Sequence, residues 1–151
     1  MTEANGVTRS TTGVPMALST YHVYGSFDKT KRREIVARVV QELGPVNFDA
    51  LAVRGVSGLI LAPIVAYLLD KHVIVVRKPK AEERSHATTT VESLIETGTY
   101  VIFDDFVATG DTARAIRDRI TAACPRLVCV GGYVWRPASQ FSTTIAKSLN
   151  R

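Results

Sequence analysis

Long apolar runs are missing from this sequence. The longest, Leu59 to Leu69, is eleven residues, whereas a helix that crosses a membrane needs about 20. The N-terminal segment MTEANGVTRS has neither the apolar core nor the small-residue cleavage site of a secretory signal. We therefore expect a cytoplasmic protein with no transmembrane helix and no secretory leader.

Cysteine is also scarce. Cys124 and Cys129 are the only two, and their spacing fits neither a CxxC motif nor a set of metal ligands. We expect both to be small apolar residues in a reducing compartment. The 151 residues are 46% hydrophobic and 22% charged, values typical of one globular domain. They exclude a disordered or collagen-like chain.

Acidic residues are fewer than basic ones. Lysine and arginine number 19 against 14 for aspartate and glutamate, which gives a formal net charge of +5. Such a balance suits an anionic partner, which can be a nucleic acid, an acidic surface or a phosphorylated metabolite.

Apolar strands alternate with helices along the chain. The expected strands are 48–53, 73–76, 100–103 and 127–134, with a shorter one at 91–95. The expected helices are 28–43, 59–69, 112–123 and 138–149. Pro63 would then have to lie near the first turn of its helix. The uniformly apolar strands predict an α/β fold, a doubly wound and mostly parallel sheet with helices on both faces. Residues 1–20 are expected to form a loose arm, and the charged stretch 77–90 a mobile loop.

The segment VIFDDFVATGDTARAI, residues 101–116, contains the most informative pattern. An apolar strand ends in Asp104 and Asp105, and a short turn then leads into a helix. In a doubly wound sheet the ligand crevice lies at the carboxyl ends of the strands. The N–H groups at a helix start bind phosphate, whereas two carboxylates suit hydroxyl groups or a metal ion. A sugar phosphate satisfies both halves of the segment.

This segment resembles the signature of the type I phosphoribosyltransferases, which bind phosphoribosyl pyrophosphate. Arg54-Gly55 after a strand resembles the pyrophosphate loop of that family. The run RGVSGLILAPIVAYLL followed by VIVVRKPK is similar to adenine phosphoribosyltransferases, and the basic loop that ends in Ser85-His86 is similar to orotate phosphoribosyltransferases. The resemblance covers about residues 45–135 and leaves the acceptor base open.

The resemblance implies a role for each matching residue. Asp104 and Asp105 would bind the ribose hydroxyls, directly or through Mg²⁺ and its waters. The 5-phosphate loop would comprise Ala108, Thr109, Gly110, Asp111 and Thr112. Pyrophosphate would be bound by Arg54, Gly55, Arg77 and Lys78, the last two from across the interface of a homodimer in many relatives. The mobile loop would close over the site with Lys80, Arg84 and His86. The base pocket would contain Phe106 and Val107, inside a small hood built from the chain ends.

Three features of the sequence allow more than one interpretation. Asp111 stands where the family often has glycine, and we expect its side chain to point outward, because a third carboxylate repels a phosphate. Trp135 is a candidate for stacking on the base, as is Tyr133, but either can be a packing residue. The chain is expected to be an enzyme that transfers phosphoribose to a purine or pyrimidine. The alternative is a non-catalytic regulator that senses phosphoribosyl pyrophosphate or nucleotide. The absence of a helix-turn-helix segment favours the enzyme over a nucleic-acid-binding regulator.

Overall fold

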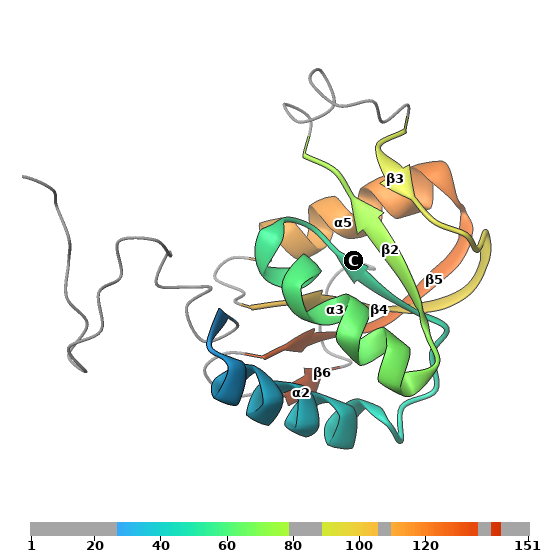
Figure 1. The fold of residues 1–151 in the computed structure, drawn as a ribbon. Coiled ribbons are helices and arrows are strands. Elements are labelled where there is room, and N and C mark those ends of the chain that lie inside the picture. Colours follow the sequence, from blue (N-terminus) through green and yellow to red (C-terminus); the bar gives the residue numbers. More distant parts are fainter. Residues whose placement is uncertain (1–26, 79–88, 106–109, 136–139, 143–151) are drawn as a thin grey trace, which may run out of the picture.

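A computed structural model describes residues 27–78, 89–105, 110–135 and 140–142 of the chain (Figure 1). The predicted N-terminal arm lies outside these residues, as do most of the predicted mobile loop and the chain ends that would form the hood. What is described is the central sheet with the helices that cover it.

Six strands form one sheet in the order β3-β2-β1-β4-β5-β6. The elements in chain order are α2 (Lys29–Leu43), β1 (Ala50–Val53), α3 (Val56–Leu69), β2 (His72–Val76), β3 (Val91–Glu92), β4 (Thr97–Asp104), α5 (Asp111–Ala123), β5 (Arg126–Val134) and β6 (Gln140–Ser142). The four central strands are parallel, and β3 and β6 pair antiparallel at the two edges. The doubly wound, mostly parallel sheet predicted from the sequence is confirmed.

Alternate side chains of the strands pack into two cores, one on each face. The α3-side core joins the sheet to α2 and α3, and it includes Leu51, Val53, Val101 and Phe103. The α5-side core joins the other face to α5, and its strand residues include Ala50, Ala52, Ile74, Val76, Tyr100 and Ile102. Figure 1 shows the helices on the two sides of the sheet.

Helix α2 begins where the sequence predicts. The Asp28 side chain caps it by accepting hydrogen bonds from the backbone N–H groups of Thr30 and Lys31, at 3.0 and 2.8 Å. Val39 and Leu43, one turn apart, are fully buried in the α3-side core. This packing fixes α2 beside α3.

The prediction for Pro63 is wrong. Helix α3 starts at Val56, three residues earlier than predicted, so Pro63 lies inside the helix and beyond its first turn. Proline cannot donate to the carbonyl of Leu59, four residues earlier. Both residues lie on the exposed side of α3, where water can bind that carbonyl and the helix can continue.

The predicted helix over 138–149 is also wrong in its described part. Gln140–Ser142 forms β6, which pairs antiparallel with Gly132–Val134 of β5. The contact with β5 decides the conformation of this segment, so tertiary pairing overrides the local helical pattern.

Candidate functional site

Residues from three parallel strands meet at one edge of the sheet. Asp104 ends β4, Arg54 follows β1 and Lys78 follows β2. Ala52, Val76 and Ile102, each two positions earlier in the chain, pack in the α5-side core. Because side chains alternate between the two faces of a strand, Arg54, Lys78 and Asp104 lie on the same face of the sheet as these residues. Strands β1 and β4 are neighbours whose connections leave in opposite directions. This is the switch point at which open α/β sheets bind ligands.

Asp104 is a buried carboxylate, with 8% of its surface exposed. Its Oδ1 accepts a hydrogen bond of 2.8 Å from the backbone N–H of Asp105. Burial is the main cause that raises the pKa of Asp104 to about 7, and a side-chain hydrogen bond with Asp105 adds to it. The nearby charge of Lys78 acts in the opposite direction. A carboxyl poised in this way is typical of a binding or catalytic site.

Arg54 and Gly55 form the turn between β1 and α3. The Arg54 Nε atom is buried and has no hydrogen-bond partner among the residues that the structure describes. Gly55 has φ +88°, and a side chain there would point toward Lys78, because a Cβ at Gly55 would lie 3.9 Å from the Lys78 Cε. The backbone of Gly55 is therefore open to a ligand that Arg54 and Lys78 can approach together.

The start of α5 lies at the same edge. Gly110 is the N-cap residue of α5 and has φ +81°. Its carbonyl accepts a hydrogen bond from the backbone N–H of Arg114. Asp111 points outward, as predicted: its side chain is 76% exposed and pairs with Arg114 at 2.8 Å. Among the residues that the structure describes, no side chain caps α5, so its first N–H groups can bind an anion such as phosphate.

Part of the predicted site lies outside the described residues. This holds for Lys80, Arg84 and His86 of the predicted loop, and for Phe106, Val107, Ala108 and Thr109. Their roles stay predictions.

Trp135 lies on the other face from the Asp104 carboxyl. One extra residue in β5 shifts the pairing with β4, because Tyr100 pairs with Cys129 and Val101 with Gly131. This bulge turns Tyr133 and Trp135 into the α3-side core, where both are fully buried. Trp135 is thus a packing residue of the described core, and a contact between it and a base stays a prediction.

Arg77, unlike Lys78, turns toward the α3 side. Its guanidinium pairs with Glu92 of β3 at 2.6 Å. Sequence reasoning missed Glu92, because the two residues are 15 positions apart and only the pairing of β2 with β3 brings them together.

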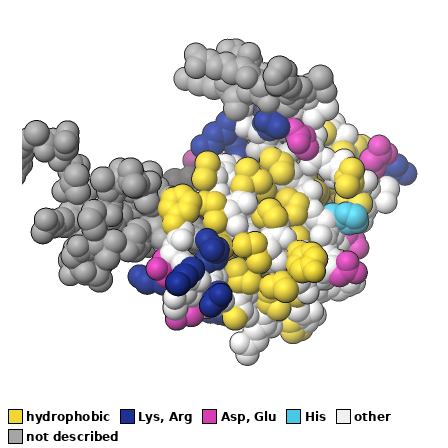
Figure 2. Space-filling model, viewed as in Figure 1, with side chains coloured by type: hydrophobic (Ala, Val, Ile, Leu, Met, Phe, Trp, Pro, Cys, Tyr) yellow, Lys and Arg dark blue, Asp and Glu magenta, His cyan; other side chains and the backbone are white. Residues whose placement is uncertain are grey.

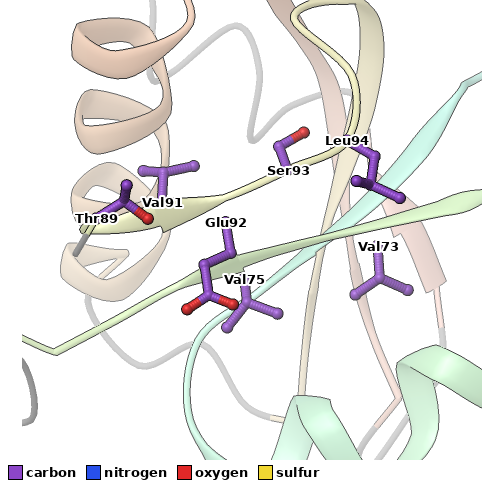
Figure 3. A pocket seen from close by; sticks show the side chains of 7 residues that line it. All are labelled: Val73, Val75, Thr89, Val91, Glu92, Ser93 and Leu94. Atoms are coloured by element: carbon purple, nitrogen blue, oxygen red, sulfur yellow. The ribbon is translucent and has the colours of Figure 1, made fainter. Parts of the chain in front are cut away.

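A hollow of about 450 Å³ lies beside this pair (Figure 3). It is lined by Val73, Val75, Thr89, Val91, Glu92, Ser93 and Leu94. Of the residues predicted to bind substrate, none lines it. Its lining is mostly aliphatic, whereas the charged groups converge at the carboxyl ends of β1 and β4.

A metal ion would have few protein ligands at that edge. No cluster of three His, Cys, Asp or Glu residues able to hold a metal occurs in the described part of the chain. Mg²⁺ is commonly bound by one or two carboxylates, with water and substrate oxygens completing its shell. Asp104 and Asp105 fit that mode. Within the described ranges, no helix is long and apolar enough to cross a membrane.

Two curated proteins are similar to the chain. The adenine phosphoribosyltransferase of Thermosipho africanus is 27% identical over 120 residues, 68% of each chain. The enzyme of the same name from Fervidobacterium nodosum is 31% identical over 102 residues. This match spans 56% of the present chain and 58% of that enzyme. No family model matches the sequence.

Solved structures share the fold. The orotate phosphoribosyltransferase of Aeropyrum pernix has a TM-score of 0.60 at 16% identity, over 97% of this chain and 91% of its own. The adenine phosphoribosyltransferase of Rhodothermus marinus has a TM-score of 0.55 at 21% identity, over 70% and 66%. These likenesses show that the chain shares the fold of the solved phosphoribosyltransferases, and its sequence is similar to two curated adenine phosphoribosyltransferases.

Proposed function

We propose that this protein transfers the 5-phosphoribosyl group from phosphoribosyl pyrophosphate to a nucleobase and releases pyrophosphate. Adenine is the base we favour, because both related sequences are named adenine phosphoribosyltransferases. One observation supports the reaction above all: a buried carboxyl, Asp104, and two cations, Arg54 and Lys78, flank the same switch point. The free thiols of both cysteines agree with the cytoplasmic location that we also propose.

The substrate would lie across the carboxyl ends of β1 and β4. The N-terminal N–H groups of α5 would bind its 5-phosphate, and Asp104 and Asp105 its ribose hydroxyls. Arg54, the Gly55 backbone and Lys78 would surround the pyrophosphate. As the bond from ribose to pyrophosphate lengthens, negative charge grows on the leaving group, and these cations stabilise it.

Ribose gains positive charge in the same step, and the Asp104 and Asp105 carboxylates offset part of it. A base nitrogen then attacks the anomeric carbon. No covalent enzyme intermediate is needed, so the protein acts by positioning and electrostatics. Asp104 and Asp105 would hold Mg²⁺, which would supply further charge neutralisation.

Pyrophosphate release tests this proposal. Purified protein is mixed with phosphoribosyl pyrophosphate and Mg²⁺, and adenine, hypoxanthine, guanine, xanthine, uracil and orotate are supplied in separate reactions. We expect release with adenine. The Asp104→Asn/Asp105→Asn double variant should lose it, and the matched control Asp118→Asn, a surface carboxylate of α5, should retain it.

Two other results are informative. Release with a different base would keep the reaction and replace the acceptor. If no base leads to pyrophosphate release but phosphoribosyl pyrophosphate binds tightly, the enzyme function would be refuted and the non-catalytic regulator favoured. If there is neither pyrophosphate release nor binding of phosphoribosyl pyrophosphate, both functions would be refuted.

We also propose that the protein is a homodimer that associates through α3. The outer face of this helix exposes large apolar side chains: Val56 65%, Leu59 40%, Ile64 38%, Tyr67 85% and Leu68 54%. Figure 2 shows hydrophobic side chains gathered over α3. An exposed apolar patch of this kind marks an association surface. A second copy suits it, because one two-fold contact would cover both patches at once.

Sedimentation tests the dimer. Tyr67→Asp should produce a monomer, because it introduces a charge into the patch. Val128→Asp is the matched control, since Val128 is 56% exposed on β5 rather than α3. A wild-type monomer, or equal behaviour of the two variants, would refute the α3 interface.

A further inference from the structure

The β2–β3 edge brings together a cation and an acid that the proposed reaction does not use as a pair. Both Nε and Nη2 of Arg77 lie 2.6 Å from one carboxylate oxygen of Glu92. A second ion pair, between Arg126 at the start of β5 and Glu96 just before β4, is longer at 3.6 Å. Its side chains are 70% and 80% exposed, against 29% for Arg77 and 45% for Glu92. Two short charge-assisted bonds fix a guanidinium, whereas one long exposed contact does not.

The sheet decides which way Glu92 points. Val75 and Glu92 are direct partners in the antiparallel pairing of β2 with β3, so their side chains lie on one face. Val75 packs against the α3-side core, and Figure 3 shows Glu92 beside it. The backbone N–H of Arg77 also donates to the carbonyl of Thr90 at 2.9 Å. Glu92 therefore stands on the α3 side, where it meets Arg77, two residues along from Val75.

The side chains of Arg77 and Lys78 consequently lie on opposite faces of the sheet. Lys78 lies near Gly55, and its charge acts on Asp104 of the same chain. Arg77 is directed toward the face on which α3 exposes its apolar patch. In the proposed homodimer this is the face nearest the second copy.

We propose that Glu92 is a positioning residue that holds the Arg77 guanidinium toward the second copy, where it can meet the pyrophosphate of that copy's site. The proposal rests on the phosphoribosyltransferase function and on the α3 dimer. Glu92 does not touch the substrate. It acts through Arg77, by removing rotamer freedom from a long side chain before substrate arrives.

Kinetics provide the first test. Glu92→Ala should raise KM for phosphoribosyl pyrophosphate on the order of tenfold, the scale expected when one binding group loses its orientation. The kcat should change much less. Glu92→Gln, which keeps one acceptor oxygen without the charge, should give a KM between those of wild type and Glu92→Ala. Glu96→Ala is the matched control and should leave KM unchanged.

The pair must also be coupled. Arg77→Ala should raise KM at least as far as Glu92→Ala, and the double variant should be no worse than Arg77→Ala alone. Additive effects, or a KM for Glu92→Ala equal to that of the control, would overturn the proposal. A merely structural role predicts a lower urea midpoint with an unchanged KM.

A second measurement does not need activity. The arginine-selective reagent phenylglyoxal is applied to each variant, and modification of Arg77 is followed by peptide mass spectrometry. Arg77 should react several-fold faster in Glu92→Ala than in wild type, and at the wild-type rate in Glu96→Ala. Equal rates of Arg77 modification in all three proteins would show that Glu92 does not restrain the Arg77 guanidinium and would overturn the proposal. An inactive wild type would instead refute the proposed function, and labelling would still decide whether Glu92 fixes Arg77.

Discussion

Asn in place of Asp104 should change how the stability of the protein depends on pH. Burial raises the pKa of this carboxyl to about 7, against 3.8 for an unperturbed aspartate. Between these values the folded state holds a proton that the unfolded state has released. Stability therefore falls as pH rises through this window, and the loss is complete above the folded pKa.

The size of the effect follows from the two pKa values. A difference of about three pH units corresponds to at most about 4 kcal/mol over the whole window, at 1.36 kcal/mol per unit. Between pH 5 and pH 8 the share is about 2.5 kcal/mol. Asparagine does not titrate, and its side-chain oxygen can still accept from the Asp105 N–H. The free energy of unfolding of the Asp104→Asn variant, relative to that of wild type, should therefore increase by about 2.5 kcal/mol between pH 5 and pH 8.

Urea unfolding without divalent cations measures this gain. Trp135 is the single tryptophan and is fully buried beside the end of β4, so its fluorescence reports the transition. The midpoint of the variant, relative to wild type, should rise by about 1 M between the two pH values. Asp118→Asn corrects for the loss of one negative charge. Parallel pH profiles of wild type and Asp104→Asn would refute the reasoning.

Three further substitutions test the packing around the site. Gly58→Ala should cost about 1–3 kcal/mol and weaken substrate binding, because its Cβ would lie 3.0 Å from that of Val53 and would push α3 off β1. Gly98→Ala should cost about 1–3 kcal/mol, because Gly98 has φ +117° and a Cβ there would lie 2.5 Å from Oδ2 of Asp49. Ile120→Ala should cost about 2–5 kcal/mol, because Ile120 is fully buried in the α5-side core. Urea unfolding gives all three values, and isothermal titration with phosphoribosyl pyrophosphate gives the change in affinity for Gly58→Ala.

Two neighbouring substitutions are the controls for these variants. Ser57→Ala lies in the first turn of α3, and Thr97→Ala replaces the exposed residue before Gly98. Unchanged midpoints in the glycine or isoleucine variants would show that the close contacts relax without cost.

Much of the fold was predictable from local signals. Runs of apolar residues predicted the central strands, and the acid pair with its turn predicted a ligand site at the carboxyl ends of the strands. The features that sequence reasoning missed depend on tertiary pairing. No local sequence feature predicts the extra residue of β5 at Val130, which decides the face of the sheet on which Trp135 lies. Likewise the contact of Glu92 with Arg77 exists only because β3 returns along β2.

The ends of helices were harder to predict than their existence. The exposed position of Pro63 lets α3 extend beyond the limit that proline usually sets. The residues at 140–142 form a strand because β5 offers them an unpaired edge.

The two edges of the sheet have a consequence for how copies of the protein associate. Both are antiparallel strands of two and three residues, β3 and β6. Short edge strands offer little backbone for pairing with another sheet. Growth of the sheet from copy to copy, the route to fibres, is thus disfavoured at both ends. In the proposed dimer, association would instead use the exposed apolar side chains of α3, and a two-fold pair would cover both patches so that no further copy could add.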